Sequence, residues 1–155
     1  MALSTVMLAI RAFNAAFAGR VRAARDQLSK RLGREVTQRE MAERLANAAA
    51  CTVSADTYGK YEDSSQPVLM PLRLLYYFAE LTGTTLEALL APVPYPGCES
   101  YQVSANDLRK YEKGIVPIPH HLLFGLSVAL DTPLEELLAP ADPRDAAMAT
   151  GAAVH

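Results

Sequence analysis

Aromatic residues and cysteines are scarce in this chain, which has no tryptophan and only two cysteines among 155 residues. Cys51 and Cys98 lie far apart, and no CxxC pair or His/Cys cluster accompanies them, so the sequence offers no zinc site. Two isolated thiols favour reduced cysteines in a cytoplasmic protein. His120 and His121 are adjacent and point to different sides of a helix, so we expect surface or helix-start histidines rather than ligands of one metal ion.

Sequence motifs of catalysis are also missing. The chain has no Gly-x-Ser-x-Gly turn, no glycine-rich phosphate loop and no cluster of carboxylates. We therefore expect neither an enzyme nor a bound cofactor. Residues 1–10 are apolar, but Arg11 interrupts them, no basic segment precedes them, and no run reaches the length of a membrane span.

Half of the residues are hydrophobic, and the abundance of alanine, leucine and arginine predicts an all-α protein. Near the N-terminus, apolar residues at helical spacing predict a helix to about residue 32, interrupted near Gly19. Residues 1–18 would be either a separate helix that packs on a partner chain, with Asn14 on the seam, or one more core-facing helix. The apolar residues at helical spacing that predict this helix are Leu3, Met7, Ile10, Phe17, Val21, Ala24 and Leu28.

Residues 37–62 carry the start signals of two short helices. Thr37 is a predicted N-cap, and Glu40 three residues later completes a capping box. Ser54 is the next predicted N-cap. Two short helices joined by a turn are typical of a helix-turn-helix. Residues 47–52 either extend the first helix or lengthen the turn.

Two more helices are expected between residues 71 and 92. Pro71 suits the start of the first, and Gly83 suits its end. Three prolines and a glycine then predict a linker at residues 93–102. The last segment, residues 141–155, is rich in alanine without an apolar stripe, which indicates a flexible tail.

An internal repeat relates residues 53–92 to residues 103–140. Both copies contain Val-Ser-Ala, Lys-Tyr-Glu, a proline, a Leu-Leu pair and the ending Leu-Glu-x-Leu-Leu-Ala-Pro. The second copy should form helices at about 105–113, 120–130 and 133–138, the last with Thr132 as its N-cap. Too few residues precede it to supply two further helices, so it is a half-domain that must pack on the first domain or on another chain.

Charge is distributed unevenly along the chain. Residues 1–50 hold nine Lys or Arg against four Asp or Glu, whereas residues 51–155 hold six against thirteen. A basic N-terminal segment and an acidic remainder suit a protein that binds phosphates with the first part and another protein with the second. The alternative is that surface charge simply drifts along the chain.

With these landmarks in order, the chain resembles the phage-repressor helix-turn-helix family of the Cro and XRE type. The match covers roughly residues 20–92, with residues 20–25 similar to the family's first helix and residues 54–62 to its recognition helix. The resemblance implies a five-helix repressor-like domain at residues 19–92. Around it we expect an N-terminal helical extension at 1–18, the Pro-rich linker at 93–102, the three-helix half-repeat at 103–140 and the tail at 141–155.

The resemblance also implies roles for individual residues. Arg25 and Glu62 match a pair that in this family forms a partly buried ion pair. Gln38 would bind a phosphate at a helix N-terminus, and Lys60 or Asp56 would read guanine or cytosine in the major groove. The full set of DNA-binding candidates is Gln38, Arg39, Ser54, Ala55, Asp56, Thr57 and Lys60.

Two features depart from the family or duplicate it. The loop at residues 63–70 has no Lys or Arg, which leaves phosphate contacts to Arg20, Arg22, Arg34, Arg39 or Arg44. The second copy presents its own candidates, Asn106, Arg109 and Lys110, which either contact DNA or are solvated on an element that only packs. Glu112 has no cognate arginine from a first helix of its own.

The leading hypothesis is a sequence-specific transcription regulator that binds double-stranded DNA as a homodimer. It would also contact a second regulatory protein or RNA polymerase. The alternative is a protein-interaction module on the same fold, antitoxin-like or a co-regulator, that does not bind DNA by itself. The near-neutral net charge of -2 and the orphan half-repeat favour this alternative.

Overall fold

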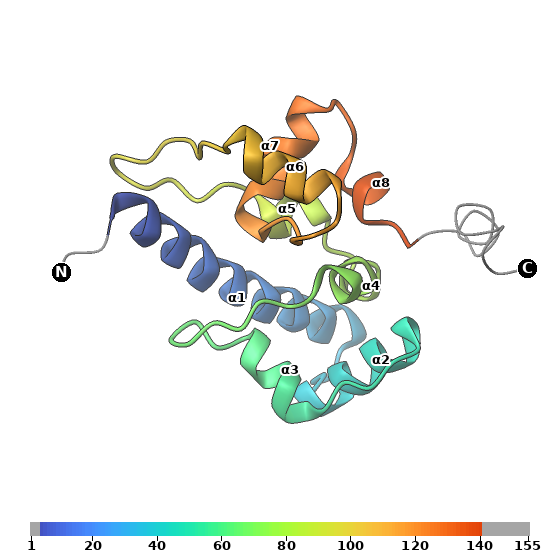
Figure 1. Ribbon diagram of the computed structural model, residues 1–155. Coiled ribbons are helices and arrows are strands. Elements are labelled where there is room, and N and C mark those ends of the chain that lie inside the picture. The colour runs from blue at the N-terminus through green and yellow to red at the C-terminus, as the bar shows by residue number, and fades with distance from the viewer. Residues whose placement is uncertain (1–3, 141–155) are drawn as a thin grey trace, which may run out of the picture.

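The computed structural model describes residues 4–140, and every regular element in that range is a helix (Figure 1). The all-α class expected from the sequence is confirmed. The tail predicted at 141–155 lies outside the described residues, as does Leu3. The helices are α1 (Thr5–Leu32), α2 (Gln38–Ala49), α3 (Ala55–Tyr61), α4 (Leu72–Thr82), α5 (Leu86–Leu90), α6 (Ala105–Glu112), α7 (His120–Ala129) and α8 (Leu134–Leu138).

The longest helix, α1, runs without interruption for 28 residues from a cap at Ser4 to the left-handed Gly33. The expected interruption near Gly19 is therefore wrong. A glycine inside a helix costs about 1 kcal/mol, but burial of neighbouring side chains such as Phe17 and Val21 outweighs that cost. The boundary predicted between residues 18 and 19 falls inside α1.

The buried face of the first turns of α1 also differs from the predicted row. Ala9 and Phe13 are buried, whereas Met7 is 46% exposed and Ile10 is half-buried. Asn14 is half-buried, and its carboxamide oxygen has no hydrogen-bond partner among the described residues. The start of α1 is therefore core-facing on one side and presents an apolar side to solvent.

α2 and α3 each begin at the N-cap that the sequence predicted. The Thr37 hydroxyl accepts from the backbone N–H of Glu40 at 3.1 Å, and the Ser54 hydroxyl accepts from Thr57 N–H at 3.1 Å. α2 continues to Ala49 and ends at Ala50, which has a left-handed φ of 51°. The residues at 47–52 thus both extend the helix and form the turn that follows.

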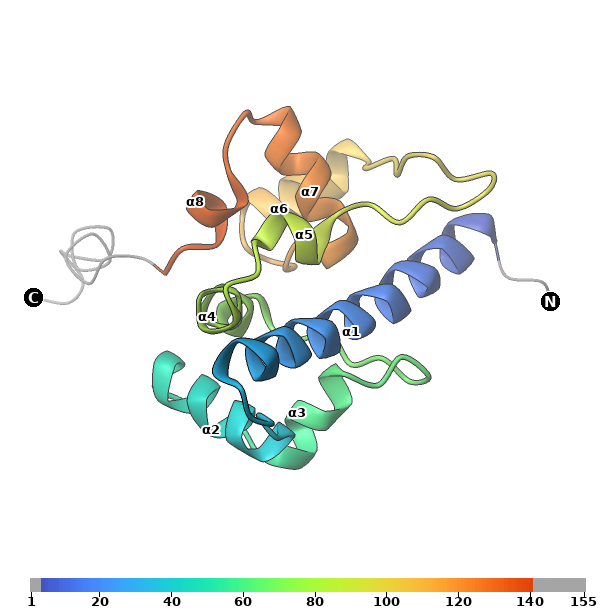
Figure 2. The same cartoon turned by 180° about the vertical axis from the view of Figure 1, so that it is seen from behind.

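Helices α1 and α4 separate two groups of helices. α2 and α3 pack together on one side, and α5 to α8 lie on the other (Figure 1, Figure 2). The core between them is apolar, and its largest fully buried side chains include Phe13, Phe17, Tyr58, Phe78 and Met41. α1 contacts α4, α5 and α7, and its Arg25 pairs with Glu62 at the end of α3, so it is linked to both groups.

The second copy of the repeat folds into three helices, α6 to α8, at nearly the predicted residues. Equivalent positions share backbone geometry: Ser104 caps α6 as Ser54 caps α3, and Asp131 takes a left-handed φ of 49° where Gly83 has 72°. The predicted cap at Thr132 is wrong. Pro133 is the N-cap of α8, and the Thr132 hydroxyl donates to Leu130 O instead.

The two copies pack on one another reciprocally. α5 of the first copy contacts α7, and α8 of the second contacts α4, while α5 and α8 also touch each other (Figure 2). Because α4 is equivalent to α7 and α5 to α8, exchanging the two copies turns the α5–α7 contact into the α8–α4 contact. This is the pattern of an approximate two-fold relation between the copies. The second copy therefore covers the apolar face of α5, including Leu89 and Leu90, which are fully buried.

Within residues 4–140, no helix combines the length and apolar character needed to cross a membrane.

Candidate nucleic-acid interface

One face of α3 is exposed and polar, and the opposite face is buried. Asp56, Thr57 and Lys60 are exposed and lie within one turn of each other. Tyr58 and Tyr61 are buried in the core on the other side. α3 can therefore present three candidate base-contacting side chains without losing its packing.

Two of the α3 candidates lie at its margin. Ala55 is half-buried, so its methyl group is less accessible than Asp56 or Lys60. The Ser54 hydroxyl donates to Thr57 Oγ1 at 2.9 Å while it caps the helix. Ser54 thus orients the Thr57 hydroxyl, while Thr57 as a residue is exposed.

Gln38, the first residue of α2, links that helix to α3. Its Nε2 donates to Glu62 Oε1 at 3.1 Å. A Cβ added to Gly59 would lie 3.1 Å from Gln38 Oε1, so α3 approaches closely only because residue 59 has no side chain. The Gln38 residue is exposed overall, and one of its two amide hydrogens is already committed to Glu62.

Arg25 and Glu62 form an ion pair that joins α1 to the end of α3. Arg25 Nε and Nη2 donate to the two Glu62 oxygens at 2.7 and 2.9 Å, and Nη1 donates to Val36 O at 2.7 Å. Only 12% of the Arg25 side chain and 3% of the Glu62 side chain are exposed. Burial raises the pKa of Glu62, but the hydrogen bonds from Arg25 and Gln38 act in the other direction, and the pKa lies below its ordinary value. The pair keeps its charges and fixes the orientation of α3.

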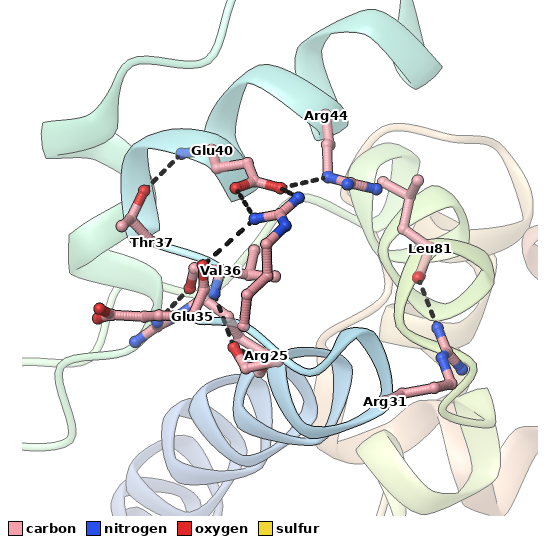
Figure 3. Close-up of polar contacts among 10 residues, drawn as sticks. Arg25, Arg31, Glu35, Val36, Thr37, Glu40, Arg44 and Leu81 are labelled. Atoms are coloured by element: carbon pink, nitrogen blue, oxygen red, sulfur yellow. Dashed lines mark hydrogen bonds and ion pairs between the residues drawn. The ribbon is translucent and has the colours of Figure 1, made fainter.

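A second cluster of charges, on the outside of α2, occupies two of the arginines expected to bind phosphate. Arg34 donates two hydrogen bonds to Glu40, at 2.7 and 2.9 Å, and Arg44 Nε donates to the same carboxylate at 2.9 Å (Figure 3). The hydrogen bond from Arg34 is the main cause that lowers the pKa of Glu40 to about 2. Both guanidinium charges are therefore partly neutralised by Glu40.

Arg20, another of the arginines expected to contact phosphate, has a structural role in the fold. Its Nη1 donates to Leu89 O at 3.1 Å and Ala91 O at 2.7 Å, which satisfies carbonyls at the end of α5. Arg22 and Arg39 are exposed and make no hydrogen bond or ion pair within residues 4–140. Arg39 and Lys60 are thus the cations of the α2–α3 pair that remain available for phosphates.

In the second copy, α6 presents its polar candidates but buries nothing. Asn106 and Arg109 are exposed and Lys110 is half-buried. No residue of α6 is buried. Glu112 is exposed and has no ion-pair partner within the described residues, in contrast to Glu62.

His120 was expected at the surface or at a helix start, and it lies at a helix start but is buried. It begins α7, as a helix-start histidine should, but it is 9% exposed and packs edge-on against Phe17 at 5.4 Å between ring centroids. Its Nε2 lies 2.7 Å from Met70 O, so this nitrogen carries a hydrogen and donates. Burial lowers the pKa of His120. The alignment of His120 with the apolar Leu72 of the first copy was the signal that could have indicated burial.

A large groove beside α6 was not foreseen. It has a volume of about 1280 Å³ and lies between the linker, α6 and α7. We refer to it as the α6 groove. Among its lining residues are Val103, Leu108, Tyr111, Leu122 and Leu126.

No protein-family model matches the chain, and no curated protein or solved structure matches it either.

Proposed function

We propose that the protein is a sequence-specific regulator that binds double-stranded DNA by inserting α3 into the major groove. Residues 19–92 would serve as a repressor-like helix-turn-helix domain, with α2 and α3 as its helix pair. The observation that carries the proposal is the division of α3 into an exposed face with Asp56, Thr57 and Lys60 and a fully packed opposite face. A rigid helix with a free polar face is what direct readout of base edges requires.

The anchoring of α3 supports this proposal. Ion pairing to Arg25 fixes the C-terminal end of the helix, and the Ser54 cap fixes its start. Gln38 and Arg39 lie at the N-terminus of α2, where free backbone N–H groups favour an anion such as a phosphate. The α2 N-terminus would therefore position the protein on the backbone while α3 reads bases.

The test is binding to duplexes selected from a random pool, measured by fluorescence anisotropy over a series of salt concentrations. We expect enrichment of a defined site and an affinity that falls steeply as salt rises. Lys60→Ala should weaken binding to the selected site by about 1–3 kcal/mol. Lys113→Ala, which removes a similar exposed charge just beyond α6, is the matched control. Failure to select a site would reject sequence-specific binding, and an equal loss of affinity in both variants would reject readout through α3.

The second candidate function is a protein-interaction module on the same fold. The α6 groove and the absence of buried residues on α6 favour it. This function predicts a stoichiometric protein partner and no DNA retention at low salt. Loss of that partner on Leu108→Asp, with Val68→Asp as an exposed control elsewhere, would assign the contact to the groove.

A further inference from the structure

Most of the large exposed hydrophobic residues within residues 4–140 lie at the start of α1 or between residues 103 and 130, and some of them line the α6 groove. A second, smaller groove lies between the α1 start and the linker and shares Tyr101, Val103 and Tyr111 with the α6 groove. The two therefore form one continuous surface. The large exposed hydrophobic residues on these segments are Val6, Met7, Leu8, Val103, Leu108, Ile115, Val116, Val128 and Leu130.

The charges that line this surface have one sign. Glu99 and Glu112 line the α6 groove, and Asp107 lines the smaller one. No Lys or Arg is among the residues that line either groove. A complementary occupant would be apolar with at least one positive charge.

The first copy of the repeat shows what pairs with the glutamate at the end of the helix that is equivalent to α6. There, the residues equivalent to Leu108 and Tyr111 are Tyr58 and Tyr61, which are buried. The residue equivalent to Glu112 is Glu62, which pairs with Arg25 of α1. The end of α6 thus has the same pattern as the end of α3, whose glutamate pairs with an arginine of α1.

The start of α1 has the pattern that such an occupant needs. Met7, Ile10 and Arg11 repeat the spacing of Val21, Ala24 and Arg25, and Arg25 is the residue that pairs with Glu62 of the first copy. Met7 and Arg11 are exposed. Arg11 makes no hydrogen bond or ion pair within residues 4–140.

We propose that the α1 start of a second copy of this chain occupies the α6 groove, with Arg11 of one copy paired with Glu112 of the other. Each chain then inserts its α1 start into the α6 groove of the other chain. The α1 start lies next to the linker of its own chain, since a Cβ on Gly97 would be 3.3 Å from Thr5 Cγ2. Because both surfaces are adjacent on one chain, a two-fold axis can form both contacts at once. The inference rests on the proposed function in that it supplies the dimer of the regulator.

The face of α5 does not compete for this role, because the chain's own α7 and α8 already cover it. The α6 groove with the α1 start, by contrast, stays open within the part of the chain that the structure describes. A dimer built here would leave the exposed face of α3 free, because none of Asp56, Thr57 and Lys60 lines either groove.

The experiment measures the oligomeric state of the full chain without DNA by sedimentation equilibrium. We expect a dimer for the unmodified protein. Arg11→Glu and Glu112→Arg should each weaken the dimer about tenfold or more, since each places like charges together. The double variant with both reversals should restore dimerisation. Val68→Glu, which changes an exposed residue outside both grooves, should leave it unchanged.

The outcomes separate this proposal from the proposed function. A monomer at the highest soluble concentration would overturn it, and so would single variants that dimerise normally, or a double variant that does not recover. Both altered residues are exposed, and far-UV circular dichroism verifies that each variant is folded. DNA binding is measured separately with Lys60→Ala, so a monomer that still selects a DNA site would overturn the dimer alone.

Discussion

The two copies of the repeat have nearly the same helices, but their first helices, α3 and α6, differ in burial. α3 and α6 begin at equivalent serine caps and share Lys-Tyr-Glu at their ends. Tyr58 is fully buried, whereas its equivalent Leu108 is 43% exposed. The difference lies outside the repeat, because only the first copy is preceded by α1 and α2. Local sequence is enough to form these helices, and neighbouring helices decide whether their apolar faces are buried.

The largest expected difference between the copies concerns those two core positions. Tyr58→Ala should lower the free energy of unfolding by about 3–5 kcal/mol, because it opens a cavity in the core. Leu108→Ala should lower it by less than about 1 kcal/mol. Urea denaturation at a concentration where the chain is monomeric compares the two. A large loss for Leu108→Ala under those conditions would mean that Leu108 is packed more tightly in the monomer than its exposure in the structure indicates.

The next difference concerns the two glutamates at the helix ends. Glu62→Ala should destabilise the fold by about 3 kcal/mol, because it leaves the Arg25 guanidinium partly buried without its carboxylate. Glu112→Ala should change stability by no more than about 0.5 kcal/mol in the monomer. The measurement is again urea denaturation, at neutral pH. Equal effects would indicate that the Arg25 pair is as weak as a surface ion pair.

A smaller difference concerns pH and the residue that follows the aligned prolines Pro71 and Pro119, which is Leu72 in the first copy and His120 in the second. Burial lowers the pKa of His120 in the folded chain below the ordinary histidine value of about 6.5. As the pH falls through that value, the unfolded chain therefore binds more protons than the folded chain. Stability should therefore fall as the pH drops from 7 to 5.5. His120→Leu, which copies Leu72, should make this fall shallower, although it also removes the hydrogen bond to Met70 O.

His121 shares this pH dependence, since burial also lowers its pKa. The variant with both histidines replaced should therefore show a flatter profile than His120→Leu alone. Denaturation midpoints at several pH values between 5.5 and 7 provide the measurement. An unchanged slope in the double variant would assign the pH dependence to other groups.

The sequence predicted the features that depend on local chemistry. The all-α class, the caps at Thr37 and Ser54 and the three helices of the second copy follow from propensity, capping and the repeat. The Arg25–Glu62 contact came from the family resemblance, and the geometry of the structure contains it.

Features set by tertiary packing were missed. Gly19 was expected to interrupt α1, but its effect on the helix is small beside the burial of Phe17 and Val21. Arg20 lies beside α5 only because of packing between residues that are distant in sequence, as its bond to Ala91 O shows. The α6 groove could not be foreseen, because it results from helices that the second copy does not have.

The smallest expected difference concerns the residue that ends the fourth helix and its equivalent. Gly83 and Asp131 both have left-handed backbones, with φ of 72° and 49°, and only glycine adopts that region without steric cost. Asp131→Gly should therefore raise the free energy of unfolding by about 0.5–1 kcal/mol.

The opposite exchange, Gly83→Asp, should lower the free energy of unfolding by more than Asp131→Gly raises it. A Cβ at residue 83 would lie 2.5 Å from Arg31 Nη1, so that side chain would have to move as well. Thermal denaturation of both variants compares the exchanges. Equal and opposite shifts would show that backbone conformation alone controls this position, whereas a larger loss at residue 83 would show that contact with α1 distinguishes the first copy even at its edge.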